Sequence, residues 1–276
     1  MGGLVLALFN RGSIKTKMIM IIGVLAVIFV FKVSPQKLMQ FVAGGSSHPV
    51  VTQTAPAPND KMRAYLETMK ADNEDVWTKI FRGYGKQYHP AKMVIYTGKT
   101  LMANGQGLAD ARMGPFYLNT DKTVYIDPHF FNELSQRFGA KGDFAQAYVI
   151  AHEIGHHVQD LLGTIDKVHG QMSRLPKAEA NRLSVRLELQ ADFYAGVFAR
   201  EADQMFDFLE NGDISEAIEC AQAIGDDTLQ REATGRVMPD SFTHGTSEQR
   251  ARWFMKGYKT GRLEDGDTFS IPYPQL

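Results

Sequence analysis

Two histidines and a glutamate stand close together in residues 151–163, which read AHEIGHHVQDLLG. His152 and His156 are four residues apart, so on a helix they share one face and their imidazoles can approach the same ion. Glu153 would lie about 100° further round the helix, beside that ion without being its ligand. A zinc hydrolase needs two neutral nitrogen ligands and a carboxylate that can take a proton from metal-bound water. The spacing therefore predicts a catalytic metal site.

Other residues of the same stretch bear on this interpretation. Solvent-facing histidines would give the pattern without any metal. Gly155, however, stands in the middle of the expected helix at a cost of about 1 kcal/mol relative to alanine, which indicates that something approaches the backbone closely there. His157 is turned away from the face shared by His152 and His156, so we assign it to hydrogen bonding or packing in preference to ligation.

A second helical pattern, over residues 178–200, offers the remaining ligand. Zinc in a catalytic site usually takes three protein ligands and leaves one position for water. Glu188 and Asp192 are four residues apart and share a face of this helix. Glu188 can complete the ligand set of one catalytic Zn²⁺, while Asp192 can accept the Nδ1–H of a ligand histidine and fix its tautomer. Taken alone, the pattern also fits a surface helix with two solvated acids.

A loop near the C-terminus, in the stretch FTHGTSEQRARWF, supplies a further candidate. Hydrolysis of an amide builds negative charge on the carbonyl oxygen, and a donor besides zinc lowers that barrier. His244 is the candidate donor, and Arg250 either braces it or pairs with a carboxylate. The alternative is a loop histidine with a structural arginine. Asp226 and Asp227 follow a helical segment and admit a cation site, but a turn at a helix end explains them better.

Helices and strands must position these residues. A start signal at Asp143, helical apolar spacing and a stop at Gly163 predict a helix over residues 143–162. Alternating side chains predict short strands at 115–118 and 123–127, around the turn NTDK, and another strand within 91–98. A strand beside a protease cleft can pair with an extended peptide, although a plain core hairpin would give the same pattern.

The N-terminal part of the chain has a different character. Residues 18–31 read MIMIIGVLAVIFVF, and basic residues precede and follow them. We expect a basic segment at 1–17, an uncleaved transmembrane anchor at 18–34, a flexible linker at 35–60 and the catalytic domain at 61–276. The basic flank would hold the N-terminus in the cytoplasm and the domain outside it. A cleaved signal peptide is the alternative.

The composition narrows the classes of function. The 276 residues are 44% hydrophobic and 22% charged, which is ordinary for a folded protein. The 30 basic and 31 acidic residues nearly cancel, so the positive surface expected of a nucleic-acid-binding protein is absent. Cys220 is the single cysteine, which excludes an internal disulfide and a cysteine-rich metal cluster.

Five blocks of sequence resemble the bacterial neutral zinc metallopeptidase family, whose members are membrane-anchored proteins with a zincin-like domain. The blocks are AYVIAHEIGHHVQDLLG, SVRLELQADFYAG, the segment from GPFY to VYID, GDISEAIECAQAIGDDTLQ and HGTSEQRARWF. HExxH with a downstream ExxAD is also similar to the gluzincin pattern of metallopeptidases. The resemblance implies that His152, His156 and Glu188 bind zinc and that Glu153 is the base.

The combined prediction is a mostly helical α+β domain of zincin-like fold, with a small antiparallel sheet, behind an N-terminal transmembrane helix. We expect an endopeptidase of the periplasmic side of the inner membrane that cleaves peptides or proteins, in which Glu153 activates a zinc-bound water and His244 stabilises the oxyanion. A non-catalytic scaffold that keeps zinc for stability is one alternative, and a latent protease is another. A structural zinc site normally has four protein ligands, and His129, His157 and His169 are poor fourth ligands.

Overall fold

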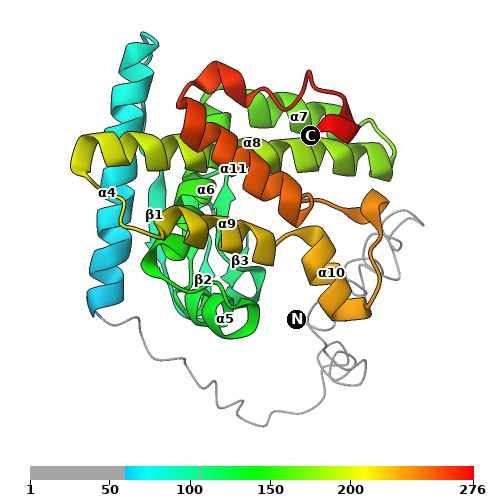
Figure 1. The fold of residues 1–276 in the computed structure, drawn as a ribbon, viewed down its shortest axis with the longest axis horizontal. Coiled ribbons are helices and arrows are strands. Elements are labelled where there is room, and N and C mark those ends of the chain that lie inside the picture. The colour runs from blue at the N-terminus through cyan, green and yellow to red at the C-terminus, as the bar shows by residue number, and fades with distance from the viewer. Residues whose placement is uncertain (1–59, 106) are drawn as a thin grey trace. The chain divides into compact units, whose positions relative to one another are not determined.

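Helices make up most of the domain. The computed structural model describes residues 60–105 and 107–276. Figure 1 shows α8 (Lys177–Phe206) running across the domain, with α6 (Asp143–Leu161) and α11 (Ser247–Thr260) packed against it and α4 (Asp60–Gly83) crossing it. The remaining elements of helical type are α5 (His129–Phe138), α7 (Thr164–Met172), α9 (Asp213–Ala223), α10 (Asp226–Thr234), η1 (Ala111–Met113), η2 (Pro239–Ser241), η3 (Leu263–Gly266) and η4 (Tyr273–Gln275).

The two helices expected to carry the site are present. The helix predicted over 143–162 is confirmed as α6, and the one predicted over 178–200 is confirmed as α8, which continues six residues further to Phe206. α11 begins with a reciprocal capping box, in which Thr246 accepts from the Gln249 backbone and the Gln249 side chain accepts from the Thr246 backbone. It ends at Gly261 with a φ of 65°, a left-handed conformation that glycine adopts without strain.

Glycines let these helices approach backbone to backbone. A Cβ added at Gly155 would lie 2.9 Å from the Ala191 carbonyl oxygen of α8, so the close approach expected at this glycine is confirmed. A Cβ on Gly196 of α8 would lie 2.0 Å from the Phe254 carbonyl oxygen of α11, and a Cβ on Gly257 of α11 would lie within 1.9 Å of α8. α8 is therefore held at main-chain distance against α6 on one side and α11 on the other.

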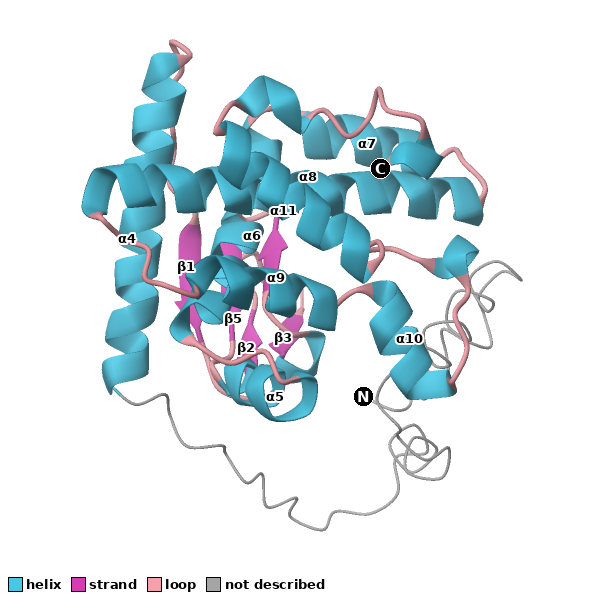
Figure 2. Ribbon diagram, in the orientation of Figure 1, coloured by secondary structure: helices cyan, strands magenta, loops and turns pink. Residues whose placement is uncertain are grey.

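The sheet is small and mixed. β1 (Lys92–Ile95), β5 (Thr123–Ile126) and β4 (Phe116–Leu118) lie in the order β1-β5-β4, and β2 (Lys99–Leu101) pairs with β3 (Leu108–Asp110) as a separate ribbon. β4 and β5 form the expected antiparallel pair, whereas β1 runs parallel to β5. The expectation of a purely antiparallel sheet was therefore wrong in this respect. After β1 the chain forms β2 and β3 and then returns to the sheet as β4. β5 follows β4 and lies beside β1 (Figure 2), running in the same direction as β1.

The central strand joins two cores. Val124 and Ile126 of β5 belong to the main core with the helices, while Tyr125 points to the other face, into a small cluster with Tyr96 and Ala109. One face of β5 thus packs into the helical core, and the other packs against the β2–β3 ribbon.

The predicted basic segment, anchor and most of the linker lie outside the described residues. Within residues 60–105 and 107–276, no helix combines the length and the apolar character needed to cross a membrane.

Candidate active site

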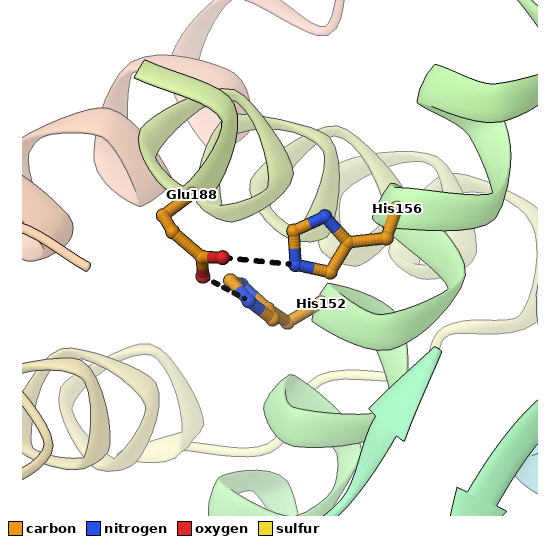
Figure 3. A group of neighbouring side chains, drawn as sticks. All are labelled: His152, His156 and Glu188. Carbon is orange, nitrogen blue, oxygen red and sulfur yellow. Dashed lines mark hydrogen bonds and ion pairs between the residues drawn. The ribbon is translucent and has the colours of Figure 1, made fainter. Parts of the chain in front are cut away.

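Three side chains that can bind a metal meet where α6 faces α8. α6 contributes His152 and His156, and α8 contributes Glu188. Figure 3 shows both imidazoles directed at the Glu188 carboxylate, with His152 Nε2 at 3.2 Å from one oxygen and His156 Nε2 at 3.6 Å from the other. Between 8% and 16% of each side chain is exposed, so the group is largely buried yet open to solvent at one side. The structure brings all three predicted ligands together.

The donor set and its spacing fit zinc. Two imidazole nitrogens and a carboxylate oxygen form a common catalytic ligand set for Zn²⁺. With tetrahedral bonds of about 2.0–2.2 Å, neighbouring donor atoms would lie about 3.4 Å apart. The nitrogens and oxygens of this group are 3.2 and 3.6 Å apart. Three protein ligands would also leave a fourth position for water or substrate.

Each histidine has a partner at its other ring nitrogen. His152 Nδ1 lies 2.7 Å from Asp192 Oδ1, and His156 Nδ1 lies 2.9 Å from Gln159 Oε1. Because an acceptor at Nδ1 holds the proton there, Nε2 of each ring is left for the metal. The Gln159 amide is itself fixed, since its nitrogen donates to the Leu187 carbonyl at 2.7 Å.

Asp192 is the centre of a buried charged cluster. Arg250 donates to both carboxylate oxygens at 2.9 Å, and the Tyr148 hydroxyl donates to Oδ1 at 2.5 Å. Burial by itself would raise the pKa of Asp192, but the charges of Arg250 and His152 and the hydrogen bonds from both side chains together outweigh burial and lower this pKa to about 2. Arg250 therefore takes the second of the two roles considered for it, pairing with a carboxylate. Asp192 remains ionised as the partner of His152.

Glu153 lies next to the ligand histidines and is buried. Burial raises the pKa of its carboxyl, and the charges of His152 and His156, with a weaker backbone hydrogen bond from Tyr117, offset part of that rise. A carboxylate with a raised pKa takes a proton from water more readily than an ordinary one. Its place beside the metal position suits a general base.

The loop that carries His244 is folded around one carboxylate. Asp226 Oδ2 accepts the backbone N–H groups of Thr243, His244 and Gly245 at 2.7, 2.6 and 3.0 Å. The His244 side chain is 51% exposed. Burial would raise the pKa of Glu188, but the charges of His156 and, to a smaller extent, His244 hold it well below its usual range. His244 therefore lies close enough to Glu188 to act on its carboxylate, and Asp226 secures the loop that carries it.

The His157 ring points away from the ligand group, toward the sheet. Its Nε2 is 2.6 Å from the His89 carbonyl oxygen, and its Nδ1 is 2.9 Å from the Tyr117 hydroxyl. The side chain is 1% exposed and joins α6 to the sheet and to the segment before it.

The sequence patterns did not lead us to assign three residues to the site, namely Tyr148, Gln159 and Asp226. Tyr148 and Gln159 stand four residues before His152 and three after His156, and this helical spacing could have indicated both. Asp226 was interpreted as part of a turn at a helix end. It stands in the first turn of α10, and its role for the His244 loop depends on a contact across 18 residues that no local pattern indicates.

Comparison with known proteins identifies the family. Residues 1–269 match the family described as "Putative neutral zinc metallopeptidase". The uncharacterized protein YpfJ of Escherichia coli K12 is 49% identical over 214 residues, which cover 77% of this chain and 74% of that protein. The uncharacterized protein Rv2575 of Mycobacterium tuberculosis H37Rv is 40% identical over 205 residues, covering 71% of this chain and 66% of that protein. No solved structure matches the chain. With all but the last seven residues of the chain inside the match and two histidines and a glutamate in zinc-binding geometry, this chain belongs to the neutral zinc metallopeptidase family.

Proposed function

We propose that this chain is a zinc-dependent endopeptidase with one catalytic ion. The observation that carries the proposal is the joint placement of His152, His156 and Glu188, whose donor atoms lie within 4.8 Å of one another, with Glu153 beside them. Partners at both Nδ1 atoms support it, because they direct both Nε2 atoms at one point before any metal arrives.

Each residue then has a task in amide hydrolysis. When bound, zinc would supply Lewis acidity, which polarises a carbonyl and makes water a better nucleophile near neutral pH. Glu153 takes the proton of the attacking water and returns it to the leaving amine. His244 donates to the carbonyl oxygen as negative charge develops there. Asp192 and Gln159 hold the two ligand rings in orientation.

The proposal includes a location. Residues 18–34 would anchor the enzyme in the inner membrane, with the N-terminus in the cytoplasm and the domain in the periplasm. The uncharged apolar stretch at 18–31 and the basic residues before it support this part. Peptides or proteins outside the cytoplasm would be the substrates.

The test measures zinc per chain and casein digestion on the full chain in detergent, with and without a chelator. We expect one zinc per chain and chelator-sensitive cleavage. Glu188→Ala should lose the zinc, and Glu153→Gln should keep the zinc but lose hydrolysis. Glu179→Ala is the matched control, because Glu179 is an exposed glutamate on the same helix.

Two results would contradict the proposal. Full hydrolysis by Glu153→Gln would remove Glu153 as the base. One zinc per parent chain without cleavage of any protein substrate would favour the scaffold or latent alternatives.

A further inference from the structure

Tyr117 contacts α6 through both its backbone and its side chain. It is the middle residue of β4, the strand at one edge of the three-stranded sheet. Its backbone lies close enough to the Glu153 carboxyl to contribute to lowering that pKa, and its hydroxyl donates to Asp160 Oδ2 at 2.5 Å. Glu153 and Asp160 are seven residues apart, which is about two helical turns, so they lie on the same side of α6. One residue of the sheet edge thus joins two points on the helix that carries the ligands.

The hydroxyl anchor is strong because Asp160 is buried. Only 2% of the Asp160 side chain is exposed, and the carboxylate also accepts from Lys122 Nζ at 2.6 Å. Hydrogen bonds to an ionised group are about twice as strong as those between neutral groups. His157 adds a contact to the same hydroxyl at 2.9 Å, and its ring is held by the His89 carbonyl.

The sheet itself restrains β4 only weakly. β4 has three residues and is paired only with β5 among the described strands, so pairing within the sheet restrains it weakly. In enzymes without substrate, hydrogen bonds to catalytic groups are often long and tighten in the reacting complex. A displacement of about 1 Å at a reacting group can lower the rate by about 100-fold.

We propose that Tyr117 is a positioning residue for Glu153, and that its hydroxyl bond to Asp160 fixes the β4 edge against α6 so that the base keeps its orientation. The inference rests on the proposed function and names a residue that affects the rate of hydrolysis through the orientation of Glu153. Tyr117 itself need not touch the reacting atoms.

Tyr117→Phe tests the proposal, with Tyr125→Phe as the matched control. Tyr125 lies in the adjacent strand but faces the other side of the sheet, where its hydroxyl accepts from the Ala103 backbone and donates to Asp121, both at 2.7 Å. Each variant therefore loses one buried hydroxyl oxygen and two hydrogen bonds. For Tyr117→Phe we expect kcat to fall about 10- to 100-fold with KM within about threefold and zinc still at one per chain. Tyr125→Phe should keep kcat within about threefold.

A second readout does not need activity. Hydrogen exchange by mass spectrometry, on the full chain with and without zinc, follows the amides of residues 115–119. We expect faster exchange of this segment in Tyr117→Phe and in Asp160→Asn, which keeps an acceptor but loses the charge, and parent-like exchange in Tyr125→Phe.

The outcomes separate this inference from the proposed function. If the parent hydrolyses casein and Tyr117→Phe retains its kcat, Tyr117 is not a positioning residue and the proposed function stands. Unchanged exchange in Tyr117→Phe would overturn the anchor whether or not the parent is active. If the parent is inactive, the assignment to Glu153 catalysis fails with the proposed function.

Discussion

The two histidines proposed as zinc ligands have chemically unlike partners. His152 faces the Asp192 carboxylate, which Arg250 keeps ionised, whereas His156 faces the neutral amide of Gln159. A carboxylate partner makes an imidazole more basic as well as orienting it, while an amide only orients it. His152 is therefore the stronger electron donor of the pair, and His156 depends on Gln159 for direction alone.

The role of Gln159 can be measured through metal affinity. Gln159→Leu removes the acceptor at His156 Nδ1, so the ring proton can move to Nε2, the nitrogen that would bind zinc. We expect zinc affinity to fall by about 10- to 100-fold, as is usual when a partner of a metal-binding histidine is lost. Competition with a chromophoric chelator of known affinity measures this.

Gln146→Leu serves as the control for that measurement, because Gln146 is a partly buried glutamine on the same helix, away from the ligands. Equal affinities for parent and Gln159→Leu would mean that packing alone orients His156.

The sequence predicted the residues whose relation is local. The spacing of His152, Glu153 and His156 follows from one helix, and Glu188 and Asp192 from another, because helical periodicity places residues four apart on one face. Tyr117 could not be found in this way. Its contact with Asp160 crosses 43 residues and depends on how β4 is placed against α6, which periodicity does not encode.

At the scale of elements, the loop before α11 depends on a single carboxylate. Asp226→Ala would leave three backbone N–H groups without their acceptor and release His244 from its place near Glu188. We expect casein hydrolysis to fall by about 10- to 100-fold, since loss of one donor to a developing oxyanion costs at least this much. Zinc content should stay at one per chain.

Asp240→Ala is the control for the loop, because Asp240 is an exposed aspartate nearby, 81% exposed, in a weak pair with Arg182. Retained activity in Asp226→Ala would show that His244 needs no support from α10 or takes no part in hydrolysis.

Replacing a glycine with alanine should change the free energy of unfolding in opposite directions at two positions, one at the crossing of α6 and α8 and one at an exposed position on α7. Gly155→Ala would place a methyl group 2.9 Å from the Ala191 carbonyl oxygen, so we expect a loss of about 1–3 kcal/mol from the free energy of unfolding. Gly170→Ala, on α7, meets nothing within 4 Å and should stabilise by up to about 1 kcal/mol, the helix preference of alanine over glycine. Urea denaturation of both variants measures the difference. A neutral Gly155→Ala would show that α6 and α8 separate without cost.

Strand direction was the element-level feature that the sequence did not provide. Alternation predicted strands at 115–118 and 123–127 and within 91–98, and all three are present as β4, β5 and β1. The antiparallel pair followed from the short NTDK turn between β4 and β5. The 27 residues between β1 and β5 form the β2–β3 ribbon and β4, and their course decides that β5 runs parallel to β1. No local sequence pattern specifies that course.

For the molecule as a whole, zinc should add stability without being required for folding. The described core of the domain is extensive and continuous from α4 to the C-terminal residue, and the ligand group occupies a small part of it. With free zinc at about 100 times its Kd, binding adds about 2.7 kcal/mol, which for a domain of this size raises Tm by about 5–10 °C. Thermal unfolding with and without chelator checks this.

Glu188→Ala is the reference for the thermal measurement, since its Tm should not respond to zinc. Complete unfolding of the parent after chelation would instead indicate a structural ion and favour the scaffold alternative.

The backbone contacts of α8 also have a consequence for motion. Gly155 and Gly196 bring α8 within main-chain distance of α6 and α11, so these three helices can neither slide nor rotate past one another without breaking close contacts. The parts of α6 and α8 that carry His152, His156 and Glu188 therefore move as one rigid body. Two neighbouring segments are held by side-chain hydrogen bonds instead. Tyr117 holds β4, and Asp226 holds the His244 loop. Under the proposed function, a bulky peptide would therefore be admitted by movement of the His244 loop, while α6 and α8 stay fixed and Tyr117 keeps β4 in place.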